Sequence, residues 1–233
     1  MFDPAKFPIE EFVSTPRLRR YLSGGKSDTE AFRLYFWNHE LAKAFLGPLA
    51  ILEVTLRNAM HEALSSKYGP DWILNDAILP LLDDDRANFD KTIGRLTPIL
   101  NRNNQILTPD AVVGSSSLGD WVRLLDVGDP RSSNHNYEKT LWEPALVNAF
   151  PHMRSGWKRR QVHHEFNRIR SFRNRVVHHE PIFHRNLRSI MEDIINAASL
   201  IHKDAGEVIK QGHCLETPLQ GRHDAIDEGD CCL

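Results

Sequence analysis

The residues of this chain best suited to chemistry are an arginine, an asparagine and a histidine within six positions of one another. They are Arg173, Asn174 and His178. On a helix that advances about 100° per residue, Asn174 and His178 lie one turn apart, and Arg173 lies about 140° from His178. An imidazole can move protons at neutral pH, and a guanidinium can bind phosphate through two hydrogen bonds. The spacing therefore predicts phosphodiester chemistry, with Asn174 orienting the imidazole or binding substrate.

The same residue types have simpler explanations, which stay open at this point. Arginine and histidine at a helix end are often solvated or paired with carboxylates. A metal is a further alternative, because the chain also holds histidines nearby, namely His163, His164, His179 and His184. The surrounding basic residues would repel a cation, so we expect no metal and no cofactor.

Residues 151–190 are strongly basic, although the whole chain has a formal net charge of only −2. This segment holds ten lysines or arginines against two glutamates, and six of the histidines. Such a stripe is typical of a surface that binds a polyanion, which makes a nucleic acid one expected partner. A solvated basic helix face would give the same pattern. Arg170 and Arg175 lie in this segment and are candidates for substrate binding.

An earlier part of the chain offers a second set of polar residues at helical spacing. Glu53, Arg57 and His61 are each four positions apart and share one helix face, with Asn58 beside them. A Glu–Arg ion pair that supports the helix is the default interpretation. The functional alternative is that Glu53, Arg57 and Asn58 support the cleft of the active site.

The elements that must position these residues are predicted to be helices, so the fold class is all-α. Helical periodicity recurs, and alternating strand patterns are scarce. We expect a helix broken or kinked at Gly47–Pro48, another over 49–67, a long basic helix over 155–180 and a last helix over 183–205. Three tryptophans, Trp72, Trp121 and Trp142, suit core packing better than base stacking. Residues 211–233 lack apolar periodicity and are predicted to be a disordered tail after one helical domain over 1–210.

The segment that starts at Arg173 reads Arg-Asn-Arg-Val-Val-His-His-Glu-Pro-Ile-Phe. It resembles the Arg-x4-6-His signature of HEPN domains, in the form seen in Abi-like (abortive infection) proteins. Segments 52–59 with 68–72, 117–125, and 141–142 with 149–151 resemble the same family in the same order. The resemblance spans about residues 15–205.

This resemblance implies an HEPN-like helical bundle with additional helices that forms a homodimer and brings two Arg-x4-6-His motifs into one cleft. HEPN nucleases cut RNA without metal, by attack of the ribose 2′-hydroxyl on the adjacent phosphate. Arg173 and His178 match the catalytic pair of the family, Asn174 matches the polar residue after the arginine, and His179 is a supporting candidate. The implied role is a toxin or abortive-infection effector in phage defence, restrained by an inhibitory RNA or protein.

Some HEPN proteins are inactive binding partners. The competing prediction is therefore a non-catalytic RNA-binding or scaffold protein that uses the same basic helix to hold a regulatory RNA or protein.

The cellular location is predicted from the lack of membrane-spanning and signal-peptide patterns in the sequence. No stretch of bilayer length is free of charge, and the first residues have no signal-peptide pattern. The three cysteines all lie within the last twenty residues, where a disulfide could not staple a core. We expect a cytoplasmic protein that does not bind a membrane.

Overall fold

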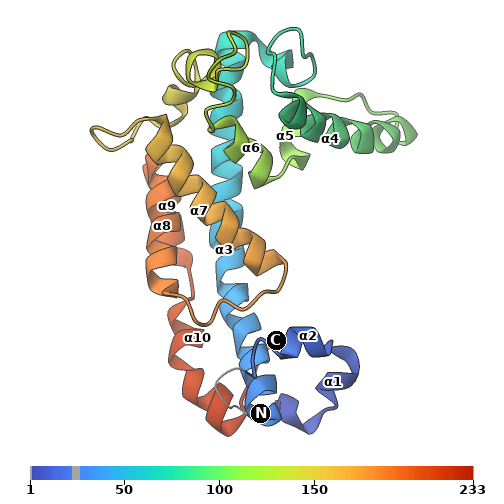
Figure 1. Ribbon diagram of the computed structural model, residues 1–233, viewed down its shortest axis with the longest axis vertical. Helices are drawn as coiled ribbons and strands as arrows, with labels where there is room; N and C mark the ends of the chain where they lie inside the picture. Colours follow the sequence, from blue (N-terminus) through green and yellow to red (C-terminus); the bar gives the residue numbers. More distant parts are fainter. Residues whose placement is uncertain (1, 23–26, 233) are drawn as a thin grey trace. The chain divides into compact units, whose positions relative to one another are not determined.

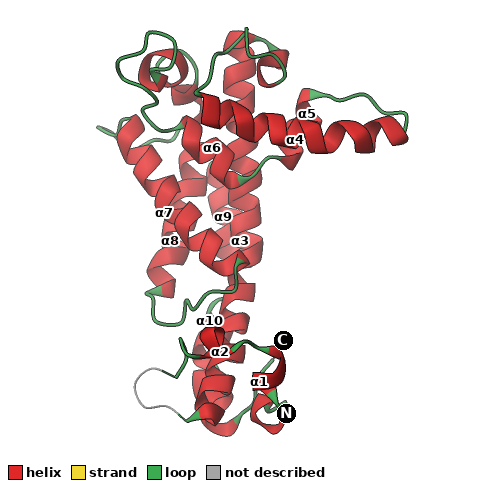
Figure 2. Cartoon of the chain, turned by 45° about the vertical axis from the view of Figure 1, so that its right-hand side comes forward, coloured by secondary structure: helices red, strands yellow, loops and turns green. Residues whose placement is uncertain are grey.

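The computed structural model describes residues 2–22 and 27–232, and over these residues the chain consists of helices and loops without strands (Figures 1 and 2). The α-helices are α1 (Ile9–Phe12), α2 (Thr15–Leu18), α3 (Asp28–Tyr68), α4 (Asp83–Arg102), α5 (Pro109–Ser115), α6 (Leu118–Leu124), α7 (Arg159–Val177), α8 (Leu187–Ile201), α9 (Lys203–Gly212) and α10 (Glu216–Gln220). Short 3₁₀- or π-helical turns are η1 (Pro4–Lys6), η2 (Pro70–Ile73), η3 (Glu138–Trp142), η4 (Leu146–Ala149) and η5 (Asp224–Glu228). The predicted all-α class is confirmed.

The chain divides into two compact units, each assembled from segments that are distant in the sequence. The first unit comprises Met1–Leu49, Ser171–Glu192 and Ile209–Leu233. The second comprises Ala50–Arg170 and Asp193–Val208. Both α3 and α7 contribute residues to each unit. The last turns of α7, with Arg173 and Asn174, belong to the first unit.

Helix α3 runs for 41 residues without interruption (Figure 1). Of the two alternatives predicted at Gly47–Pro48, a break or a kink, the break is therefore wrong. A proline inside a helix costs about 3 kcal/mol, because it removes one hydrogen bond and crowds the preceding turn. Buried apolar residues nevertheless recur every three or four positions on both sides of Pro48, at Leu41, Phe45, Leu49 and Leu52. Burial stabilises by roughly 1.5–3 kcal/mol for each such side chain, which outweighs the cost of the proline.

The terminal segment that was predicted to be disordered is folded, and that prediction is wrong. Residues 213–232 contain α10 and η5, and bury Leu215, Ile226 and Cys231. The indole Nε1 of Trp37 donates a hydrogen bond to the carbonyl of Pro218 at 2.7 Å. The guanidinium of Arg33 donates to the carbonyls of Ile226 and Asp227. These contacts fix the segment against α3 without needing a regular apolar period.

The second unit has an aromatic centre. Trp72, Phe89 and Trp121 are almost fully buried, with ring centroids about 6 Å apart in edge-to-face pairs. Trp142 is also buried and stacks on Phe150. The prediction that Trp72, Trp121 and Trp142 are core residues is confirmed.

Two predicted helices differ from the observed ones, the first at its ends and the second by a division into two helices. The basic helix predicted over 155–180 is α7, which ends at Val177. The last predicted helix, over 183–205, is divided into α8 and α9. No helix among residues 2–22 and 27–232 is both long and apolar enough to span a membrane.

Candidate functional site

Helix α7 presents the candidate catalytic residues on its last turns. Its buried side chains, Val162, Phe166, Ile169, Phe172 and Val176, recur every three or four residues and form one apolar stripe. The intervening positions are polar, which is why the sequence forms an amphipathic helix here.

Of the three residues predicted to be catalytic, Asn174 and His178 are exposed and Arg173 is half-buried. The amide of His178 donates to the carbonyl of Asn174 at 3.0 Å, so the two residues lie one helical turn apart. Arg173 precedes Asn174 on the same turn. The helix thus brings an imidazole and a carboxamide to one exposed end, with a guanidinium on the adjoining face.

The helix ends in a Schellman motif directly after these residues. The amide of Glu180 donates to the carbonyl of Arg175 at 2.8 Å, and the amide of His179 donates to that of Val176 at 3.2 Å. His179 occupies the left-handed position with φ 55°, where glycine is more common. Pro181 then prevents the helix from continuing.

Two side chains from elsewhere in the first unit hold this helix end. Arg17 donates to the carbonyls of His178 and His179, at 3.4 and 3.2 Å. Asn38, only 1% exposed, accepts hydrogen bonds from the amides of Ile182 and Phe183 and donates to the carbonyl of Glu180. Several hydrogen bonds therefore fix the main chain of His178 and of the residues that follow it.

His179, predicted as a supporting residue, is exposed and lies beside a second histidine. Its ring centroid is 5.5 Å from that of His39, which is half-buried on α3. The pKa of His39 lies below the usual histidine value, first because of burial and then because of His179 and Arg17. His39 is therefore mainly neutral at neutral pH.

The predicted substrate-binding arginines have identifiable partners. Arg175 donates to Oε2 of Glu180 at 3.0 Å, and Arg20 approaches the same oxygen at 3.8 Å. Arg170 donates to Oδ1 of Asn167 at 3.0 Å. Arg175 belongs to the first unit with the candidate catalytic residues, whereas Arg170 belongs to the second.

The net positive charge of residues 151–190 is partly balanced by acids from outside that segment. Arg159 is buried and pairs with Glu138, and Arg168 pairs with Asp193. Arg188 pairs with Glu216 at 2.7 Å. A count of charges within one sequence segment does not include such partners. It therefore overstates how much free positive charge the surface of that segment carries.

The second predicted set lies wholly in the second unit. A carboxylate oxygen of Glu53 accepts a hydrogen bond from the amide of Leu118 at 3.2 Å, at the first residue of α6. A carboxylate suits this position because the first amides of a helix carry partial positive charge. Arg57 donates to the carbonyl of Gly114 in α5 at 2.9 Å. Both residues thus attach neighbouring helices to α3.

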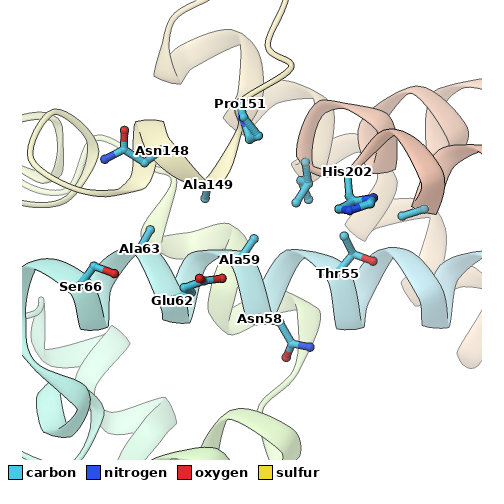
Figure 3. A pocket seen from close by; sticks show the side chains of 12 residues that line it. Thr55, Asn58, Ala59, Glu62, Ala63, Ser66, Asn148, Ala149, Pro151 and His202 are labelled. Atoms are coloured by element: carbon cyan, nitrogen blue, oxygen red, sulfur yellow. The ribbon is translucent and has the colours of Figure 1, made fainter.

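Asn58, which was predicted beside that set, lines an open hollow of about 590 Å³ in the second unit. The small side chains of Ala59 and Ala63 point toward Ala149 and Pro151 across it (Figure 3). That Glu53, Arg57, Asn58 and Arg170 support catalysis stays a prediction.

Sequence reasoning missed Asn38, Arg17, Arg20 and Glu180. A signal existed for Asn38, because it follows Leu34 by four positions and precedes Leu41 and Phe45 by three and seven. All three of those residues are buried. A polar residue within an apolar stripe is expected to satisfy buried hydrogen-bonding groups. Nothing in the sequence indicated that Arg17 or Arg20 reaches the end of α7.

No protein-family model, curated protein or solved structure matches this chain. The resemblance to HEPN domains therefore rests on the motif residues and stays a prediction. Across residues 2–22 and 27–232, no three His, Cys, Asp or Glu side chains gather closely enough to hold a metal ion.

Proposed function

We propose that this chain is an endoribonuclease of the HEPN type that cleaves RNA without a metal ion. The observation that carries the proposal is the end of α7, where exposed His178 and Asn174 lie one turn apart beside Arg173. The hydrogen bonds of Asn38 and Arg17 hold this end in place. A fixed main chain suits catalysis, because a positioned group loses little freedom when substrate binds.

The proposed reaction is a transesterification within the RNA. The imidazole of His178 takes the proton of a ribose 2′-hydroxyl, and the 2′-oxygen forms a bond to the adjacent phosphorus. The bond from phosphorus to the 5′-oxygen of the next nucleotide breaks, and that oxygen takes up a proton. Arg173 stabilises the negative charge that develops on the phosphoryl oxygens. The products are a 2′,3′-cyclic phosphate and a 5′-hydroxyl.

The acid that protonates the leaving oxygen is proposed to come from a second copy of the chain. In a homodimer, one copy of His178 would act as base and the other as acid. The proposed biological role is a toxin or abortive-infection effector in the cytoplasm, restrained by an inhibitory RNA or protein partner. This role follows from the family resemblance alone.

The test is incubation of the purified wild-type protein with mixed cellular RNA in EDTA, followed by analysis of the fragment ends. Cyclic phosphate ends with wild type, and a loss of at least about a hundredfold in rate for His178→Ala and for Arg173→Ala, are the expected results. The matched control is His164→Ala, because His164, like His178, is an exposed histidine of the basic segment 151–190. It is expected to cleave at the wild-type rate.

Three outcomes would contradict the proposal. Equal losses of cleavage rate in His178→Ala and His164→Ala would show that His178 has no specific role in catalysis. Cleavage that EDTA abolishes would contradict a metal-independent reaction. RNA that binds in a gel-shift assay but stays intact with wild type would favour the competing function, a non-catalytic RNA-binding or scaffold protein.

A further inference from the structure

An open hollow of about 500 Å³ lies in the first unit, next to the end of α7. Its lining consists of Arg20, Arg175, Glu180, Pro181, Phe183 and His184. Its volume falls within the usual range for pockets that bind small molecules, about 300–1,000 Å³. Glu180 and Arg175 are each two positions along the chain from a candidate catalytic residue, namely His178 and Arg173. The hollow and the proposed site of cleavage are therefore built from the same stretch of chain at the end of α7, although residues two positions apart on a helix point in different directions.

The charged groups of the hollow offer both donors and an acceptor. The two contacts of the Glu180 carboxylate with arginines, 3.0 Å to Arg175 and 3.8 Å to Arg20, both fall on Oε2. Within the described part of the chain, no hydrogen bond to Oε1 is formed by a protein group. The side chain of Arg20 is 59% exposed and that of Arg175 is 37% exposed, so both guanidiniums remain accessible.

One wall of the hollow is aromatic. Phe183 packs against buried Tyr21, with ring centroids 5.6 Å apart. His184 is exposed and meets Phe183 edge to face, with centroids 5.4 Å apart. Burial and the nearby Arg185 and Arg175 lower the pKa of His184, which favours its neutral ring at neutral pH. Unpaired bases of RNA stack on such rings and on guanidinium planes.

Guanine matches this combination of groups better than the other three bases. Its Watson–Crick edge carries two adjacent N–H donors, which a carboxylate can accept together, and its O6 and N7 are acceptors that suit arginine. Cytosine presents only one amino group to a carboxylate, and adenine lacks the O6 acceptor. Uracil is smaller and carries a single ring N–H.

We infer that the hollow lined by Arg20, Arg175, Glu180 and His184 binds a guanine base of the RNA, with the Glu180 carboxylate as the specificity-determining group. The assignment of this guanine to the substrate rests on the proposed function. The binding site itself does not, because a free nucleotide would occupy it without cleavage.

The experiment measures binding of 5′-GMP, 5′-AMP, 5′-CMP and 5′-UMP to the full chain by isothermal titration calorimetry. All four carry the same phosphate, so differences report on the base. We expect 5′-GMP to bind at least about tenfold more tightly than the others, and Glu180→Gln to remove that preference. The matched control is Glu216→Gln, because Glu216 is ion-paired with an arginine in the same unit but lies outside the hollow.

A second variant, His184→Ala, separates stacking from base recognition. It removes an exposed ring and should weaken binding of all four nucleotides by a similar factor, with the guanine preference retained. Because the ring is exposed, its removal should leave the fold intact. The thermal midpoint of each variant checks that weaker binding does not come from unfolding. Equal affinity for all four nucleotides in wild type, tighter binding of 5′-CMP, or a guanine preference that survives Glu180→Gln would each overturn the inference.

The two proposals fail in different ways. If 5′-GMP binds selectively but wild type leaves RNA intact, the ribonuclease proposal fails and the guanine site stands. If wild type cleaves RNA with no fixed guanine near the cut and 5′-GMP is not selected, the guanine site fails and the ribonuclease proposal stands.

Discussion

Asn38 is a single buried side chain that satisfies three main-chain groups of the segment after α7. Its oxygen accepts from two amides and its nitrogen donates to one carbonyl. These groups belong to residues that follow His178, so Asn38 is a positioning residue for the candidate site and not a catalytic one. A buried donor or acceptor left without a partner costs about 1–3 kcal/mol.

Replacement of Asn38 by alanine should lower the free energy of unfolding by about 2–4 kcal/mol, because it leaves those main-chain groups without their partner. The measurement is urea unfolding followed by circular dichroism. Asn101→Ala is the control, since Asn101 is exposed on α4, and should change the value by less than about 0.5 kcal/mol. A loss for Asn38→Ala no larger than that of the control would contradict the structural role given to Asn38.

The last segment of the chain, residues 213–232, is the element whose order is most open to a direct test. Cys231 is 2% exposed, and its amide donates to the carbonyl of Phe2. Cys214 and Cys232 are exposed. Burial is the main reason that the pKa of the Cys231 thiol is raised to about 12. The reactive form of cysteine is the thiolate, so burial and raised pKa both slow its chemistry.

We therefore expect two of the three thiols of the native protein to react rapidly with Ellman's reagent at pH 8. The third should react more than about a hundredfold more slowly until denaturant is added. Cys231→Ser should abolish the slow phase and leave the fast one unchanged. Three thiols that react at one rate would mean that residues 213–232 do not pack as described.

The elements differ in how far the sequence predicts them. The amphipathic period of α7 is local, so periodicity predicted this helix, although α7 begins and ends a few residues inside the predicted range 155–180. The uninterrupted α3 was not predictable from Pro48, because burial of residues on both sides outweighs a local penalty. The folded terminal segment was missed for a related reason, since its contacts reach Arg33 and Trp37 almost two hundred positions earlier.

The same holds for the candidate site, where the sequence predicts local features but not long-range contacts. The spacing of Arg173, Asn174 and His178 is a local property and was visible in the sequence. The supports of that turn are not local, because Asn38 bonds residues 142–145 positions away and Arg17 bonds residues 161–162 positions away. Within a single sequence, only a polar residue in an apolar stripe signals such a support.

For the molecule as a whole, half-buried histidines in both units couple stability to pH. His39 belongs to the first unit, and His61 and His163 belong to the second. Burial is the largest cause that lowers the pKa of each, and it outweighs Asp110 near His61 and Asp126 near His163. The exposed His223 is the opposite case, because a hydrogen bond with Asp227 raises its pKa.

The sign of the effect follows from proton uptake. Below about pH 6.5, the usual histidine pKa, these three histidines bind protons in the unfolded chain before they do in the native protein. Their contribution to stability is therefore complete above that pH and is lost as the pH falls toward their native pKa values. Each proton of difference changes the free energy of unfolding by about 1.4 kcal/mol per pH unit. His223 has a raised pKa and therefore stabilises the native protein as the pH falls. It is one exposed residue against three half-buried ones, so its effect is expected to be smaller.

The free energy of unfolding should therefore fall by about 1–3 kcal/mol between pH 7 and pH 5.5, a range in which most carboxylates stay ionised. Urea unfolding at half-unit intervals of pH measures it. His61→Asn should flatten the dependence, because the asparagine oxygen can replace Nδ1 as the acceptor for the indole of Trp72, now 3.1 Å away, without taking up a proton. A free energy of unfolding that is constant or rises as the pH falls over this range would show that the buried histidines do not control the acid response.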